Sequence, residues 1–166
     1  SAITANDYDV VLIMGPLYHL VLAEDRKTAL RQAYSRLKRG GLILSTFVSR
    51  YGIWGDVMKQ LPHYIDLEKD VQSIIREGKD FDLSGREGVV RAYSADPSQI
   101  PRFHEEAGYR TIVLAGIETA GIRDEYYNLL QGKRREMWLD LLFSISTQPS
   151  IIGASNHILY VGEKEG

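Results

Sequence analysis

The stretch YDVVLIMGPLYHL, residues 8–20, decides the fold of this chain. It opens with an unbroken apolar run over 8–14, which is typical of a strand buried on both faces of a parallel sheet. The run stops at a Gly-Pro pair, and Tyr18 and His19 follow at once. Ligands of open α/β sheets bind beyond the carboxyl ends of the strands. The stretch therefore predicts a buried strand whose end faces a binding site.

The residues after this stretch complete a strand–helix–strand unit. From Leu30 onward, apolar residues recur at i, i+3, i+4 and i+7, which places them on one face of a helix. We expect this helix to end at Gly40-Gly41, where glycine permits a positive φ, with basic residues in its last turn. The run LILSTFV, 42–48, is a second strand of the buried kind. Two strands joined in this way are parallel, and their connection is right-handed.

The middle of the chain is less regular than its two ends. Apolar spacing predicts helices over 53–61 and 66–77, which end at Pro62 and Gly78. Residues 78–92 are glycine-rich and charged, and we interpret them as a mobile connection with room for a short strand. The remaining predicted elements are a helix that begins at Asp96 and closes at Gly108, a strand over 109–116, helices over 123–131 and 135–146, and a strand over 157–164.

Length and composition favour a single domain over residues 1–166. A net charge of −2 gives no reason to expect a nucleic acid partner. No apolar run reaches the length of a membrane span, and the first residues lack a signal peptide's apolar region, so we expect a cytoplasmic chain without a membrane partner. The chain has no cysteine. Its four histidines, His19, His63, His104 and His157, have no metal-ligand spacing, so we expect no metal and interpret them as solvated or packed.

Polar and aromatic residues also follow the second predicted strand. Ser49, Arg50 and Tyr51 come directly after it, at the same edge of the sheet as Tyr18. Two adjacent strand ends of this kind are typical of a substrate pocket. Two interpretations of Arg50 stay open, because its side chain could orient an anionic acceptor or cap a helix. Trp54 likewise could face an acceptor or belong to the core of an amphipathic helix.

The chain resembles the second half of a class I S-adenosylmethionine (SAM)-dependent methyltransferase. The residues that carry the resemblance are YDVVLIMGPLYHL, the helix end RLKRGG, the strand LILSTFV, the helix end FHEEAGY and the final strand HILYVGEK. It extends over essentially the whole chain. It implies an α/β fold with a Rossmann-like partial sheet, in which a βαβ unit is followed by a C-terminal antiparallel hairpin. The implied reaction is direct transfer of a methyl group from SAM to a small molecule.

The resemblance also assigns residues to the two ligands. Met14, Gly15, Pro16, Leu17 and His19 would bind the cofactor, and Tyr18, Arg50, Tyr51 and Trp54 would bind the methyl acceptor. Tyr18 and His19 are the candidates for a catalytic role. No proton carrier is obligatory for this chemistry, because alignment of the acceptor with the sulfonium methyl group can supply the rate.

One part of the family pattern is missing. The family's first half carries a Gly-x-Gly turn that cradles the cofactor, and no two glycines of this chain are separated by a single residue. We therefore expect a fragment that binds SAM weakly or not at all. The strand over 8–14 would then have an open edge, which predicts self-association through these residues or pairing with the missing half. The alternatives are a non-enzymatic half-domain for dimerisation or regulation of a partner, and an enzyme of another Rossmann-like family.

Overall fold

The computed structural model describes residues 6–79, 92–118 and 124–166, and within them the chain forms one mixed sheet. Its strands are β1 (Tyr8–Ile13), β2 (Leu37–Ser49), β3 (Ser94–Ala95), β4 (Tyr109–Gly116) and β5 (His157–Lys164). The order across the sheet is β1-β2-β5-β4, and β3 pairs with the end of β2. β1 runs parallel to β2, whereas β5 is antiparallel to both β2 and β4. The predicted parallel unit and antiparallel hairpin are both confirmed.

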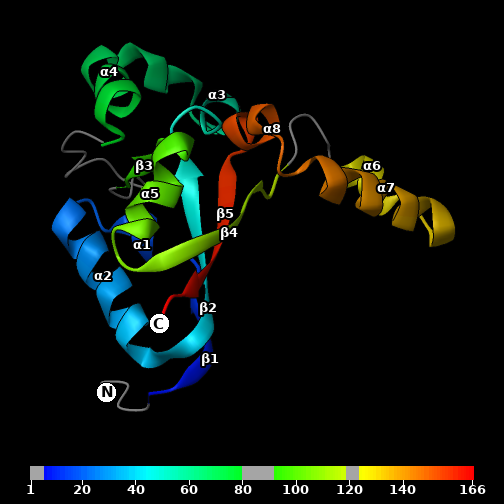
Figure 1. Ribbon diagram of the computed structural model, residues 1–166. Helices are drawn as coiled ribbons and strands as arrows, with labels where there is room; N and C mark the ends of the chain where they lie inside the picture. Colours follow the sequence, from blue (N-terminus) through cyan, green and yellow to red (C-terminus); the bar gives the residue numbers. More distant parts are fainter. Residues whose placement is uncertain (1–5, 80–91, 119–123) are drawn as a thin grey trace.

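Helices connect these strands and cover one side of the sheet. They are α1 (Pro16–His19), α2 (Ala23–Arg36), α3 (Trp54–Gln60), α4 (Glu68–Glu77), α5 (Ile100–Glu105), α6 (Asp124–Asn128), α7 (Gly132–Ile145) and α8 (Pro149–Ala154), with 3-10 turns η1 (Pro62–Asp66) and η2 (Pro97–Gln99). Figure 1 shows α2 and α5 beside the sheet, α3 and α4 beyond its upper end, and α7 projecting away from it. Most of the predicted connection over 78–92 lies outside the described residues.

The main hydrophobic core lies between the sheet and the helices α2 and α5. Alternate residues of β2 and β5 point into it, as the period of two in a strand requires. Its fully buried members include Leu30, Ile43, Phe47, Ile100, Tyr109, Ile158 and Tyr160. A second, smaller cluster joins α3, η1 and α4 around Tyr64, Val71 and Ile74. The second cluster holds the segment that follows β2 over the end of the sheet.

The expectation that the first strand is buried on both faces is wrong. Val10, Leu12 and Met14 are 45%, 62% and 48% exposed. These side chains share the sheet face opposite the main core, where Leu12 lies in register with Leu44 and, through it, with Val161. An apolar run fits a strand covered on both sides, but the described helices cover only one. The other face of β1 is therefore open among the residues that the structure describes.

The predicted end of the first long helix is also wrong. α2 ends at Arg36, and Leu37 already has extended backbone angles. Lys164 donates from its Nζ to the carbonyl oxygens of Tyr34 and Leu37, at 3.0 and 2.7 Å. The Tyr34 carbonyl also accepts from the amide of Leu37, so Lys164 adds a second donor at this helix end. Gly40 does have a positive φ of 73°, but it lies inside the irregular first part of β2.

The helix expected over 135–146 is confirmed as α7, but its apolar stripe is not buried. Met137, Trp138 and Leu141 are exposed, and α7 has no buried residue. Figure 1 shows why, because the helix projects away from the sheet. No described helix combines the length and the apolar character needed to cross a lipid bilayer.

Candidate functional site

The carboxyl ends of β1 and β2 lie at one edge of the sheet, and three further segments reach it. α1 follows β1 directly, and Ser49 is the last residue of β2. β5 runs in the opposite direction, so its first residue, His157, lies at this edge, in register with Val48. Glu118 follows the end of β4 nearby. We call this edge the carboxyl rim.

Gly15 sets the direction in which the chain leaves β1. Its φ of 119° belongs to the region that glycine adopts readily and other residues avoid. The amide of Tyr18 donates to the carbonyl oxygen of Gly15 at 3.3 Å, and the amide of Leu20 donates to that of Pro16 at 3.1 Å. Leu17 anchors the turn in the main core with no exposed surface. The turn at Gly15 thus explains why Tyr18 and His19 follow β1 so closely at the rim.

Three aromatic rings meet at the rim. The rings of Tyr18 and His19 have centroids 4.7 Å apart, and the ring of His157 lies edge-on to Tyr18 at 6.2 Å. The carbonyl oxygen of Tyr18 accepts a hydrogen bond from the amide of Tyr93 at 2.7 Å, which ties α1 to the segment before β3. Tyr18 is half-buried and His19 is exposed. Residues from α1 and β5 therefore bring three aromatic rings together at the rim.

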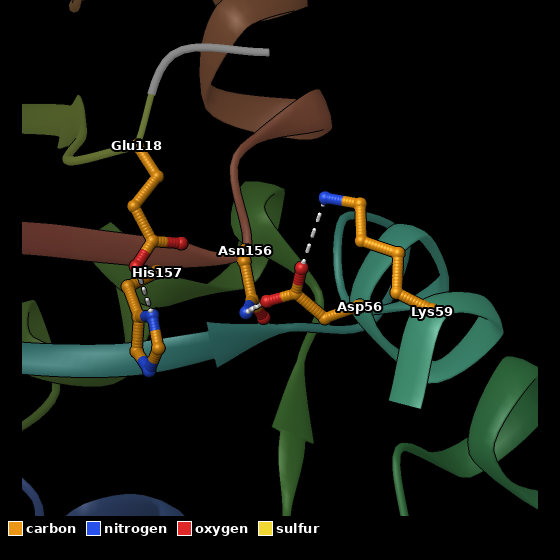
Figure 2. A network of polar contacts seen from close by, with 5 residues as sticks. All are labelled: Asp56, Lys59, Glu118, Asn156 and His157. Atoms are coloured by element: carbon orange, nitrogen blue, oxygen red, sulfur yellow. Dashed lines mark hydrogen bonds and ion pairs between the residues drawn. The ribbon is translucent and has the colours of Figure 1, made fainter. Parts of the chain in front are cut away.

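His157 is held by a carboxylate. Its Nδ1 lies 2.9 Å from Oε1 of Glu118 (Figure 2). A carboxylate oxygen can only accept, so the imidazole carries a proton on Nδ1 and, when neutral, leaves Nε2 as an acceptor. Within the described residues, Nε2 makes no hydrogen bond. The side chain of His157 is 34% exposed, which leaves this nitrogen within reach of a ligand.

Asn156 and Asp56 fix the turn that leads into β5. The side-chain nitrogen Nδ2 of Asn156 donates to Oδ2 of Asp56, and Nζ of Lys59 lies 3.5 Å from Oδ1 of the same carboxylate (Figure 2). The backbone carbonyl oxygen of Asn156 accepts from the backbone amide of Ser49 at 2.7 Å. These contacts join α3, β2 and β5. They set the position of the backbone from which His157 projects.

Two of the predicted acceptor residues have structural partners. Arg50 is buried, and its guanidinium donates to the carbonyl oxygens of Arg76, at 3.2 Å, and Ser94, at 3.5 Å. Arg76 lies in the last turn of α4, so the guanidinium of Arg50 contacts the end of this helix as a capping residue does. Trp54 is half-buried and packs against the small cluster of α3, η1 and α4. Tyr51 is 49% exposed.

The predicted cofactor residues differ in how much of their surface is exposed. Met14, Pro16 and His19 are exposed and Gly15 is half-buried, so each offers surface at the end of β1. The side chain of Leu17 is buried in the main core and offers none. In the ranges 6–79, 92–118 and 124–166, no group of three histidine or carboxylate side chains gathers as a metal site.

Sequence reasoning missed the pairing of His157 with Glu118. From the sequence, His157 is interpreted as solvated or packed, because the four histidines have no metal-ligand spacing. The signal was in the topology. Because β5 is antiparallel to β4, β5 begins at the rim where β4 ends. Glu118, just after β4, and His157, the first residue of β5, therefore meet there.

No family model matches the chain, and no curated protein sequence matches it significantly. Solved structures do match. A SAM-dependent methyltransferase from Methanosarcina mazei superposes with a TM-score of 0.57 at 11% identity, over 99% of this chain and 63% of that one. The fold is that of a SAM-dependent methyltransferase. The structural match confirms the fold that the sequence resemblance predicted.

Two further structures agree with this methyltransferase fold. A SAM-dependent methyltransferase from Listeria monocytogenes, described as putative in its own right, matches at 13% identity over 100% of this chain and 65% of that one, with a TM-score of 0.54. A possible histamine N-methyltransferase from Thermotoga maritima matches at 14% identity over 99% of this chain and 60% of that one, with a TM-score of 0.53. The chain thus spans about three-fifths of the length of the methyltransferases whose fold it shares.

Proposed function

We propose that this chain forms the methyl-acceptor side of a SAM-dependent methyltransferase that acts on a small molecule. One observation carries the proposal: Tyr18, His19 and His157 gather at the carboxyl rim of a sheet with the fold of SAM-dependent methyltransferases. This rim is where open α/β sheets bind their ligands. The aromatic surface is suited to a small organic acceptor, and positioning of that acceptor against the sulfonium methyl group supplies the rate.

SAM would contact the chain at the end of β1. Met14, Pro16 and His19 have exposed surface there, and the positive φ of Gly15 lets the backbone approach a ligand closely. These residues form one wall of a SAM site. The given sequence contains no Gly-x-Gly turn that could cradle the cofactor, because no two of its glycines are separated by one residue. We infer that the chain alone binds SAM weakly and that further residues complete the site.

The open edge of β1 is where we place those further residues. β1 forms backbone hydrogen bonds with β2 on one side and with no other described strand. An unpaired apolar edge pairs readily with another strand. In this proposal the partner is a strand of the missing half, and a second copy of the chain takes its place when that half is absent.

Calorimetric titration with SAM and with S-adenosylhomocysteine tests the proposal. We expect weak or no heat of binding for the chain by itself, and clear binding for the longer polypeptide of which this proposal makes it a part. In that polypeptide, His19→Ala should weaken SAM binding, because His19 lies at the end of β1. His63→Ala is the matched control, since His63 is exposed on η1 and takes no part in the ring contacts of Tyr18, His19 and His157. A longer polypeptide that binds neither ligand would contradict the proposal.

A second candidate function is a non-enzymatic module that docks on a partner protein. The observation that favours it is the open apolar surface of β1 and α7, where Leu12, Met137 and Trp138 are exposed. Exposed apolar patches of this kind mark interaction surfaces. Absence of SAM binding in both the chain and the longer polypeptide, together with a stable complex with another protein, would favour this function over methyl transfer.

A further inference from the structure

We propose that His157, oriented by Glu118, accepts the proton that a hydroxyl or amine acceptor loses when it is methylated. The inference rests on the proposed function and specifies its acceptor class. Its starting point is the pair itself, which the sequence did not single out and which lies at the carboxyl rim with one ring nitrogen engaged and the other free.

Three sets of backbone and neighbour contacts fix the position of His157. Its backbone lies in the β5 ladder opposite Val48, and its carbonyl oxygen accepts from the amide of Ile117 at 3.0 Å. Asn156, the residue before it, is held by Asp56 and by the amide of Ser49. A rigid backbone and an oriented ring are what a proton acceptor needs, because proton transfer requires hydrogen-bond reach in a defined direction.

The orientation of the ring makes Nε2 the reactive nitrogen. Glu118 binds Nδ1–H, so the lone pair lies on Nε2, on the opposite side of the ring (Figure 2). The rings of Tyr18, in α1, and His157 meet edge to face with centroids 6.2 Å apart, so an acceptor lying against Tyr18 is close to the His157 ring. Once protonated, the imidazolium is stabilised by the Glu118 carboxylate at 2.9 Å.

The step balances with SAM as the methyl donor. The oxygen or nitrogen of the acceptor bonds to the methyl carbon, the carbon–sulfur bond breaks, and its electron pair stays on sulfur. Nε2 of His157 takes the O–H or N–H proton. A carboxylate acceptor has no such proton at neutral pH, because carboxyl groups are ionised there. The pair therefore favours alcohols, phenols and primary amines over carboxylic acids.

Nuclear magnetic resonance of the chain tests the orientation without any methyl transfer. With ¹⁵N-labelled histidine at a pH of about 8.5, above the ordinary imidazole range, we expect His157 to carry its proton on Nδ1. Glu118→Gln should keep this tautomer, since the amide oxygen still accepts, whereas Glu118→Ala should release a mixture. Glu106→Ala is the matched control, because Glu106 is an exposed carboxylate before the start of β4, at the opposite end of that strand from Glu118. An Nε2–H tautomer in the unaltered chain, or no change in Glu118→Ala, overturns the proposal.

Methyl transfer by the longer polypeptide tests the chemistry. The probes are methyl-labelled SAM with a panel of phenols, primary amines and carboxylic acids. His157→Gln, which can still donate to Glu118, should lower kcat for phenols or amines about 100- to 10,000-fold, the usual contribution of a general base, with little change in KM. His63→Gln should keep the full rate, and the melting temperature of each variant reports its folding.

The outcomes separate this inference from the function on which it rests. Full activity of His157→Gln, or transfer to carboxylic acids alone, overturns the role of His157 and leaves the methyltransferase. Transfer to no member of the panel by a polypeptide that binds SAM overturns it as well. Failure to bind SAM overturns the proposed function, and the catalytic role of His157 with it.

Discussion

Nε2 of His104 lies 2.9 Å from the hydroxyl of Ser45 in the main core, and the two side chains complete a buried polar pair. Nδ1 of the same ring donates to the carbonyl oxygen of Ile100 at 2.8 Å, so Nε2 accepts from the serine. The ring also stacks on Tyr160 at 3.7 Å. Every polar atom of the neutral imidazole therefore has a partner, and burial lowers the pKa of His104 to about 4.

This depressed pKa predicts a loss of stability in acid. In the unfolded chain the imidazole binds its proton with an ordinary pKa near 6.5, so protonation favours unfolding. The stability is fully present above pH 6.5 and falls as the pH decreases from there towards 4. Between pH 7.5 and 4.5 we expect His104 to cost the folded state about 2 to 3 kcal/mol. Chemical denaturation at the two pH values measures this loss.

Two variants isolate the contribution of His104 from that of the carboxylates. His104→Gln cannot titrate, so the difference in its unfolding free energy between the two pH values should be smaller than that of the unaltered chain. His63→Gln replaces an exposed histidine and should leave the difference unchanged. Parallel losses in the unaltered chain and in His104→Gln would show that His104 is not the group responsible.

Arg50 should act on stability and leave ligand binding unaffected. Its guanidinium satisfies the carbonyl oxygens of Arg76 and Ser94, and its removal leaves them without these donors. We expect Arg50→Ala to lower the free energy of unfolding by about 1 to 3 kcal/mol and to increase hydrogen exchange in α4. Arg102→Ala, in an exposed ion pair with Glu106, is the control and should cost less than about 1 kcal/mol. Weaker ligand binding by Arg50→Ala with unchanged stability would return Arg50 to the acceptor role.

The sequence predicted the elements whose signals are local. The limits of β4 and β5 match the expected 109–116 and 157–164, and Asp96 accepts from the amide of Ser98 at the start of η2 as an N-cap should. The Gly78 stop of α4 is also confirmed, with a left-handed φ of 70°. Alternation, capping and glycine stops are properties of a few consecutive residues. They can therefore be derived without knowing the fold.

The features that sequence reasoning missed depend on contacts between distant residues. α2 ends at Arg36, before Gly40-Gly41, and Lys164, more than a hundred residues away, binds the carbonyl oxygens of Tyr34 and Leu37 there. The same holds at the site, where Glu118 and His157 meet only because β4 and β5 are antiparallel. No short-range pattern contains either contact. The helix end and the acid–imidazole pair thus required the arrangement of the strands.

Gly15 should be essential to the turn that carries Tyr18. Its φ of 119° is strained for any residue with a side chain, and an added Cβ would lie 3.4 Å from the Tyr18 hydroxyl. We expect Gly15→Ala to lower the free energy of unfolding by about 1 to 3 kcal/mol and to shift the resonances of Tyr18 and His157. Gly55→Ala is the matched control, because Gly55 lies in α3 with open space around it and should be neutral or stabilising. Equal effects of the two substitutions would contradict the role given to Gly15.

The open surface of β1 should make the chain self-associate. Val10 and Leu12 are exposed on the uncovered face, and the backbone edge beside them pairs with no described strand. Light scattering should therefore report an average mass that rises with protein concentration. Leu12→Lys should reverse this rise, because a buried lysine at the contact would lose its hydration without a partner. Met58→Lys adds the same charge on exposed α3 and should leave association unchanged. A monodisperse monomer at high concentration would mean that β1 is closed by other means.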